Sequence, residues 1–107
     1  MKQIKFFQLK NGDEPVKQWL LSLDKATMAK VVKRIERIYD DNFGDFKQIA
    51  PNLYELRFFF GKGYRIYYTI QNGSVVILLC AGDKSKQSKD IETAKKYLKE
   101  LRDDTND

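Results

Sequence analysis

The sequence contains no histidine, so it lacks the side chain that most often transfers protons or binds metal ions near neutral pH. Its single cysteine, Cys80, excludes an internal disulfide framework, and this low cysteine usage favours a cytoplasmic protein. Because no histidine is present to activate the thiol, we expect Cys80 to be a small buried hydrophobic residue and not a nucleophile. The composition therefore predicts no metal site and no cofactor.

Long hydrophobic runs are also absent. No stretch approaches the roughly 18 apolar residues of a membrane span, and Met1-Lys2 is followed by a strand-like segment in place of a signal peptide. With 107 residues, 42% of them hydrophobic, the chain is expected to form one soluble domain, residues 1–107, without a linker. The acidic residues at its end predict a frayed tail at 103–107.

Negative charge is scarce relative to positive charge. The 20 Lys and Arg residues outnumber the 15 Asp and Glu residues, and three of the acidic residues lie in the expected tail. A small domain with a pI near 9.3 is typical of proteins that bind nucleic acid or an acidic protein. Charge alone does not choose between these partners.

The most informative stretch is residues 53–86, in which apolar and polar side chains alternate. Gly61-Lys62-Gly63 and Asn72-Gly73 interrupt it, so it predicts three antiparallel strands joined by two tight turns. Turns of three and two residues define a register in which, for example, Phe58 lies opposite Ile66. This register predicts a core face formed by Tyr54, Leu56, Phe58, Ile66, Tyr68, Ile70, Val75, Ile77 and Leu79.

The opposite face of these strands carries both guanidinium groups and aromatic rings. In the expected register Arg57 lies opposite Tyr67, and Phe59 lies opposite Arg65. Guanidinium groups bind phosphate oxygens, and aromatic rings offer bases a surface for stacking. The pattern is equally compatible with a solvated sheet face that carries cation–π pairs.

Helical spacing predicts two helices before this sheet. Residues 3–9 form an expected edge strand, Asp13 is a candidate cap for a short helix beginning at Pro15, and Trp19 lies on its apolar stripe. Asp24 is expected to cap a second helix that runs to about Tyr39. Both helices should pack on the apolar face of the sheet.

The second helix is expected to present a basic ridge on its outer side, formed by Lys30, Lys33, Arg34 and Arg37. Such a ridge is usually only solvated, although it can also contact nucleic acid or an acidic partner. Residues 40–52 fit either a short strand or a loop. Phe43 and Phe46 are expected to fix this stretch to the edge of the core.

After the third strand, residues 82–89 lead into a final helix whose apolar stripe contains Ile91 and Leu98. Ser88 or Asp90 is the expected cap of this helix. A cluster of basic residues precedes it, close in space to the first glycine turn, and consists of Lys84, Lys86 and Lys89. Lysines beside a helix N-terminus favour the binding of anions.

Three segments, LYELR, GYRIYY and AGDKSKQSKDIETA, resemble the RelE/ParE superfamily of bacterial toxins, most closely its HigB-like branch of addiction-module killer proteins. The resemblance covers nearly the whole chain. It implies an α+β, RelE-like fold with an N-terminal strand and a helical hairpin packed on a three- to four-stranded antiparallel sheet, followed by a C-terminal helix.

The resemblance also implies a function. RelE-like members enter the ribosomal A site and cut messenger RNA, and a cognate antitoxin, often a helix-turn-helix protein, neutralises them and carries the complex to operator DNA. The positions that match the working residues of the family are Arg57, Arg65, Lys84 and Lys86. The RelE pattern often has a tyrosine or histidine near the end of the site, where this sequence has Asp90.

These residues could cut RNA without a metal by transesterification through the ribose 2′-oxygen. Arg57 and Arg65 would hold the phosphate, and Lys84 would protonate the leaving oxygen or act as a further clamp. Glu55 and Asp90 are the nearby carboxylates that could accept the 2′ proton. The residues expected to contact RNA beside them are Phe59, Lys62, Tyr67, Lys86 and Lys89. The alternatives are a ParE-like toxin that binds gyrase and a plain protein-binding module.

Overall fold

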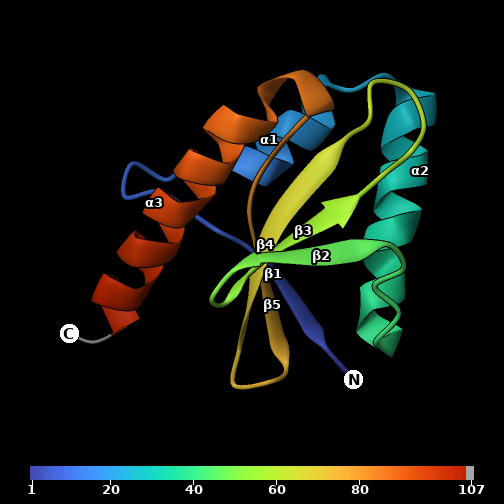
Figure 1. Cartoon of the computed structure of the whole chain (residues 1–107). Coiled ribbons are helices and arrows are strands. Elements are labelled where there is room, and N and C mark those ends of the chain that lie inside the picture. Colours follow the sequence, from blue (N-terminus) through green and yellow to red (C-terminus); the bar gives the residue numbers. More distant parts are fainter. Residues whose placement is uncertain (106–107) are drawn as a thin grey trace.

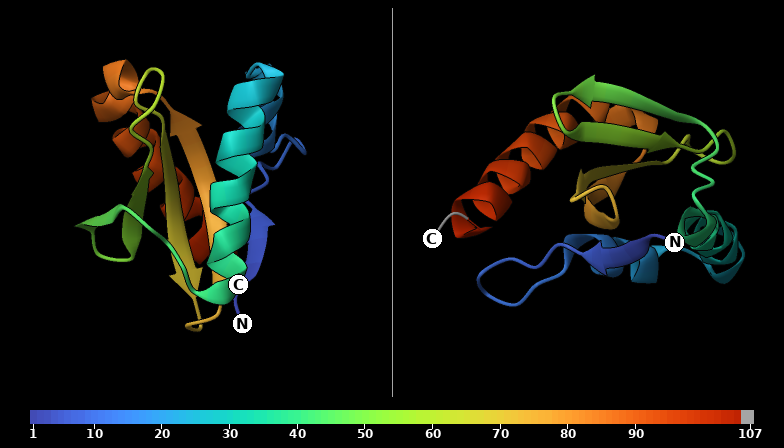
Figure 2. Two further views of the ribbon diagram at one scale, coloured as in Figure 1. Left: turned by 90° about the vertical axis from the view of Figure 1, so that its right-hand side faces the viewer. Right: turned by 90° about the horizontal axis from the view of Figure 1, so that it is seen from below.

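The structure, a computed structural model, describes residues 1–105, with the side chains of residues 1–103. A five-stranded sheet has helices on both faces (Figures 1 and 2). The strands are β1 (Gln3–Phe6), β2 (Phe46–Ala50), β3 (Leu53–Arg57), β4 (Arg65–Gln71) and β5 (Val75–Gly82). Their spatial order is β1-β5-β4-β3-β2, with β1 parallel to β5 and the other neighbours antiparallel. The predicted α+β class and central meander are confirmed, with five strands where three or four were expected.

Both edges of the sheet come from segments outside the meander. Residues 3–9 supply β1 at one edge, as predicted, and residues 40–52 supply β2 at the other. Phe43 packs on the core, where its ring stacks on that of Tyr68 with centroids 5.5 Å apart. Phe46 is 49% exposed on the edge strand, and its ring lies against that of Phe43 with centroids 5.9 Å apart, at the edge of the core as expected.

The helices are α1 (Pro15–Ser22), α2 (Lys25–Glu36) and α3 (Gln87–Thr105), with short 3-10 helices η1 (Arg37–Asp40) and η2 (Lys84–Lys86). Asp24 caps α2 as predicted: its carboxylate accepts from Thr27 N at 3.1 Å, and this hydrogen bonding lowers the pKa of Asp24. The predicted cap Asp13 is wrong, since the residue preceding α1 is Glu14. Among residues 1–105, no helix combines the length and apolar character that crossing a membrane requires.

Helical geometry at the C-terminal end begins earlier than predicted. Asp83, directly after β5, accepts a hydrogen bond from Ser85 N at 2.9 Å and caps η2, so Ser88 and Asp90 are not caps. The expected frayed tail is also wrong for residues 103–105, because α3 continues to Thr105. Residues 106–107 lie outside the described part of the chain.

The first hairpin keeps the predicted faces but not the predicted partners. Leu56 pairs with Ile66, and Arg57 pairs with Arg65, two residues away from the expected register. The turn is therefore a longer loop, residues 58–64, closed by Phe58 N donating to Tyr64 O at 3.0 Å. Because side chains alternate with a period of two, a shift of two residues leaves each on its own face, and the alternation could not detect it.

The second hairpin is shifted by one residue, which does exchange faces. Tyr68 pairs with Leu78 where Ile77 was expected, and a bulge follows at Tyr67/Tyr68. Val76 and Leu78 consequently face α1 and α2, whereas Val75, Ile77 and Leu79 face α3. Residues 75–80 are all apolar because both faces of β5 are covered, so the sequence carried no alternation from which to read the register.

α3 lies on the opposite side of the sheet from α1 and α2 (Figure 2), and a hydrophobic cluster lies under each set of helices. One joins α1 and α2 to Leu56, Phe58 and Ile66. The other joins α3 to Tyr67 and to Cys80, whose burial was predicted and raises the pKa of its thiol to about 12. The sheet face that was expected to be open to solvent is therefore largely covered by α3.

Candidate functional site

Two segments that are far apart in the sequence meet at one end of the sheet. The loop of residues 58–64 joins β3 to β4, and residues 82–90 contain the end of β5, η2 and the first turn of α3. The backbone N–H of Lys84 donates to the carbonyl of Lys62 at 3.3 Å, which fixes the two segments together. The predicted proximity of the glycine turn and the lysine-rich segment is therefore confirmed.

This junction carries an exposed group of cations, Lys62, Lys84 and Lys86, called here the lysine cluster. None of the three side chains forms an ion pair with another described residue. They line two neighbouring clefts, of about 520 and about 510 Å³, which share Lys62 and Asp83. Lys89 is also exposed, on the first turn of α3, but is not among the residues lining either cleft. Asp24, Asp83 and Asp90 also line the larger cleft, so the lysines there favour a single anionic group such as a phosphate.

Gly63 allows the close approach of the two segments. Its φ is +70°, and a Cβ at this position would lie 3.4 Å from Lys84 Cβ and 3.9 Å from Arg65 Nη1. A glycine here therefore satisfies the left-handed backbone and leaves room for Lys84. The structure thus brings Lys84 and Arg65 together, as the sequence predicted.

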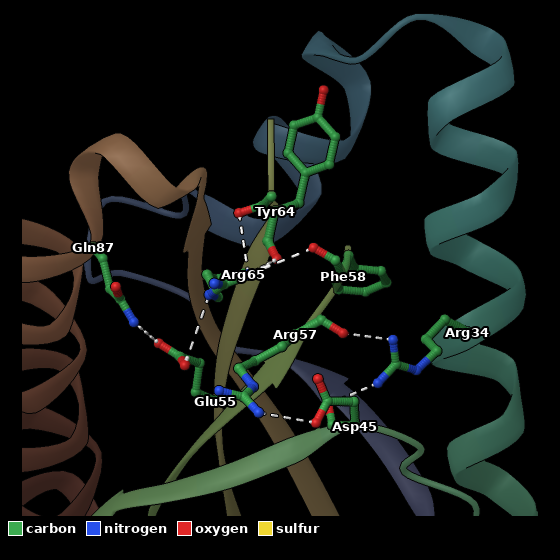
Figure 3. Close-up of polar contacts among 9 residues, drawn as sticks. Arg34, Asp45, Glu55, Arg57, Phe58, Tyr64, Arg65 and Gln87 are labelled. Carbon is green, nitrogen blue, oxygen red and sulfur yellow. Dashed lines mark hydrogen bonds and ion pairs between the residues drawn. The ribbon is translucent and has the colours of Figure 1, made fainter. Parts of the chain in front are cut away.

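Arg65 lies beneath the loop and not on an open face (Figure 3). It is only 7% exposed, and its Nη1 donates to the carbonyls of Phe58, Gly63 and Tyr64 at 3.5, 3.3 and 3.2 Å. The expectation that this guanidinium points to solvent is wrong. In this conformation Arg65 supports the loop that carries Lys62.

Glu55 is the buried partner of Arg65. Its side chain is 1% exposed, with Oε1 3.7 Å from Arg65 Nε and Oε2 accepting from Gln87 Nε2 at 2.8 Å (Figure 3). Because both carboxylate oxygens have partners inside the protein, Glu55 is poorly placed to accept a proton from a ligand. It instead links β3, β4 and the first residue of α3.

Arg57 is the cross-strand neighbour of Arg65, so the two arginines do lie on the same face. The expected pairs Arg57–Tyr67 and Phe59–Arg65 are nevertheless wrong. Arg57 Nη2 is 3.1 Å from Asp45 Oδ1, and this hydrogen bond raises the pKa of Arg57. Its side chain remains 32% exposed, so it can still meet a ligand from this position.

Arg34 was expected on the outer ridge of α2 but points inward. It donates to the carbonyls of Arg57, Phe43 and Asp45 at 2.6, 3.1 and 2.7 Å, and so fixes α2 to β3 and to the start of β2 (Figure 3). The other three ridge residues are exposed. A groove of about 270 Å³ lies beside α2. It is lined by the four basic residues of the expected ridge, Lys30, Lys33, Arg34 and Arg37, and by Phe58, Phe59 and Phe60.

The two aromatic residues predicted to stack on bases differ in their exposure to solvent. Phe59 is 75% exposed, and the guanidinium of Arg57 lies 5.6 Å from its ring centroid. Tyr67 is fully buried under α3, which raises the pKa of its hydroxyl, so the expectation of an exposed Tyr67 is wrong. The cause is the path of α3, which covers that part of the sheet.

Asp90 faces the larger cleft from the first turn of α3, and burial raises the pKa of its carboxyl group. Trp19 and Tyr64 line the same cleft, with their rings edge to face and centroids 5.8 Å apart. Trp19 packs on the core as predicted, while another part of its ring lines the cleft, which the apolar stripe did not indicate. Ser22, one helical turn after Trp19, was a polar signal that this stripe ends at a surface.

The chain is similar to a described protein family and to a bacterial protein. Residues 18–104 match the profile of a family described as phage derived protein Gp49-like (DUF891). An uncharacterized protein of Haemophilus influenzae is 49% identical over 84 residues, which cover 78% of this chain and 85% of the relative. The matched region contains the loop, the lysine cluster, Arg65 and Asp90.

Proposed function

We propose that this protein, which belongs to the Gp49-like family of phage-derived proteins, is the toxin of a type II toxin–antitoxin pair and cuts messenger RNA on the ribosome. The Gp49-like family is a RelE/HigB-like toxin family. The segments LYELR, GYRIYY and AGDKSKQSKDIETA support the further proposal that this chain is a member of the HigB-like branch. The structural observation that carries the proposal is the unpaired lysine cluster beside two clefts.

The proposed reaction is transesterification without a metal ion. The ribose 2′-oxygen attacks the adjacent phosphorus, the bond from phosphorus to the 5′-oxygen breaks, and the products are a 2′,3′-cyclic phosphate and a 5′-hydroxyl. Lys62 and Lys86, which line the same cleft as Asp90, hold the phosphate oxygens and offset the charge that grows on them. Lys84 then gives a proton to the leaving 5′-oxygen.

Asp90 is the proposed acceptor of the 2′ proton, because it faces the cleft and its raised pKa makes it a stronger base than an ordinary carboxylate. Glu55 is not proposed for this step, since Arg65 and Gln87 occupy its oxygens. Arg65 acts as a positioning residue whose charge lies under the loop, and Arg57 binds a flanking phosphate. Such a site relies on alignment of the RNA, which the ribosome would supply.

The proposed partners follow from this role. They are messenger RNA, the ribosome and a cognate antitoxin of the helix-turn-helix class, with operator DNA reached only through the antitoxin complex. The proposed location is the cytoplasm, where translation occurs.

Replacement of Lys84 tests the proposal, because this exposed side chain can be removed without opening the core. Lys84→Ala should abolish growth arrest on expression, whereas Lys96→Ala, an equal change at an exposed position on α3, should leave it intact. Mapping of RNA ends should show new 5′-hydroxyl ends in translated messages for the wild type alone. Gyrase-linked DNA breaks with intact RNA would indicate a ParE-like toxin instead. Efficient cutting of naked RNA would indicate a free ribonuclease.

A further inference from the structure

The larger cleft, called here the Trp19 cleft, has a composition that the lysine cluster alone does not explain. Its volume of about 520 Å³ is within the range of about 300 to 1,000 Å³ usual for small-molecule sites. Trp19 and Tyr64 form an aromatic wall, while Lys62 and Lys86 line the same hollow. An aromatic surface beside two cations suits a ligand that has both a flat ring and a phosphate.

Asp90 differs from the other carboxylates of this cleft. Asp24 accepts a hydrogen bond from Thr27 N at 3.1 Å, and Asp83 accepts one from Ser85 N at 2.9 Å. The Asp90 carboxylate has no such bond to the described residues, and its Oδ2 is buried without a partner. A ligand in the cleft would therefore meet Asp90 through Oδ1, since Oδ2 is turned toward Gly82 inside the protein.

The Asp90 carboxylate lies against the end of β5. A Cβ on Gly82 would overlap Asp90 Oδ2, so the glycine leaves the space that the carboxylate occupies. Asp90 also approaches β5 through its backbone carbonyl, which accepts from Cys80 Sγ at 3.4 Å. The backbone of Asp90 is thus held against β5, and Oδ2 packs on Gly82.

We propose that the Trp19 cleft binds the purine nucleotide on the 5′ side of the cut. Its base lies against Trp19 and Tyr64, its 3′-phosphate lies at Lys62 and Lys86, and its 2′-hydroxyl faces Asp90. This inference rests on the proposed function and deepens it by naming the substrate subsite. A purine is favoured over a pyrimidine because its larger ring system covers more of the aromatic wall.

The test uses Trp19 itself, because it is the single tryptophan of the chain and its fluorescence reports directly on the cleft. Purified wild-type protein is titrated with guanosine 3′-monophosphate and with uridine 3′-monophosphate. We expect a saturable change of fluorescence, with the guanosine nucleotide bound several-fold tighter because its larger ring system covers more of the aromatic wall. Equal affinities would overturn the purine preference. No fluorescence change up to about 10 mM would overturn the subsite, since binding weaker than this is negligible.

Variants that keep Trp19 separate the contacts. Lys62→Ala and Lys86→Ala should each weaken guanosine 3′-monophosphate several-fold, and the effect should fade as salt is raised. Lys96→Ala, equal in charge but remote on α3, should bind as the wild type does. Equal affinities of all three variants would overturn the assignment of the phosphate to these lysines.

The titration contains no ribosome, so its failure is distinguishable from failure of the proposed function. In cells, messages should be cut after purines, and Trp19→Phe should weaken that preference while retaining an aromatic core residue. Cleavage without nucleotide binding, or with an unchanged preference in Trp19→Phe, would overturn the subsite and leave the toxin proposal standing. Nucleotide binding without any message cleavage would overturn the toxin proposal and support the cleft as a nucleotide site.

Discussion

At Arg65, a guanidinium held almost entirely out of water lies 3.7 Å from the buried Glu55 carboxylate and donates to three carbonyls of the loop that carries Lys62. Removing one partner of a buried pair leaves the other charge unsolvated, which usually costs more than the intact pair contributes. Replacement of Arg65 should therefore lower the free energy of unfolding, apart from any effect on catalysis.

We predict that Arg65→Ala lowers the free energy of unfolding by about 3 kcal/mol, because Glu55 is left buried without its cation. Urea denaturation measures this change. The matched control is Arg57→Ala, whose pair with Asp45 is about a third exposed, so its loss of stability should be clearly smaller. Similar losses for the two variants would show that the Arg65–Glu55 pair has no special structural role.

Asp90 gives a prediction that depends on pH. Burial raises the pKa of its carboxyl group, so folding disfavours the charged form. The contribution of Asp90 to the free energy of unfolding is fully favourable below the pKa that this carboxyl group has in the unfolded chain. It is lost as the pH rises through the higher pKa of the folded protein. Asp90→Asn, which never ionises, should therefore have a higher Tm than the wild type at neutral pH, and the difference should vanish in acid. Asp40→Asn, at an exposed position, is the control; a Tm difference independent of pH would contradict this account.

At the scale of elements, the sequence pattern predicted the meander well but its registers poorly. The faces of β3 and β4 could be predicted because apolar and polar side chains alternate there. Their pairing could not, because a shift of the register by two residues leaves this alternation unchanged. The faces of β5 could not, because residues 75–80 are apolar throughout. A strand covered on both sides gives no alternation to read.

At the candidate site, too, local sequence patterns predict some features and not others. The proximity of Lys62 and Lys84 was predictable, since consecutive antiparallel strands bring their ends together. The burial of Tyr67 and Arg65 was not, because it depends on where α3 returns across the sheet, which local patterns do not specify. The role of Trp19 as a cleft wall was also hidden, because one ring serves both the core and the cleft.

The loop and η2 are coupled through Gly63, which yields a prediction at this scale. Gly63→Ala should lower the free energy of unfolding by about 1 kcal/mol because of its positive φ. The new methyl group would only touch Lys84 Cβ, at 3.4 Å, but relaxation of the strained loop should move Lys84 through the bond from Lys84 N to Lys62 O. Growth arrest should therefore weaken markedly.

Gly73→Ala is the matched control for this substitution. Its φ of +72° imposes the same backbone strain, but nothing lies within 4 Å of the new Cβ. Denaturation should show comparable losses of stability in the two variants, whereas a growth assay should show reduced toxicity in Gly63→Ala alone. Equal toxicity of the two would mean that the contact with Lys84 is unimportant.

The whole molecule is a sheet with one hydrophobic cluster on each face, and the site lies where the two halves meet. The α1–α2 side contributes Trp19 to the Trp19 cleft, the loop contributes Lys62, and the α3 side contributes Lys86 and Asp90. Detachment of α3 would therefore dismantle the site and expose the second cluster in one event. Gln87, whose amide donates to Glu55 Oε2 at 2.8 Å, fixes the beginning of α3 to the sheet.

Cys80 reports on that event, because it is the single cysteine and is buried beneath α3. Its thiol, with a pKa raised to about 12, should react with a thiol reagent only when α3 moves away. Gln87→Ala removes a hydrogen bond to a carboxylate, worth about 1.5 kcal/mol, so labelling under native conditions should be about tenfold faster than in the wild type. The control Gln48→Ala removes only an exposed 3.3 Å bond to Ala50 O and should leave the rate unchanged. If Gln87→Ala labelled no faster than this control, the opening that exposes Cys80 would not involve the first turn of α3. The bond between Gln87 and Glu55 would then have no effect on the detachment of α3.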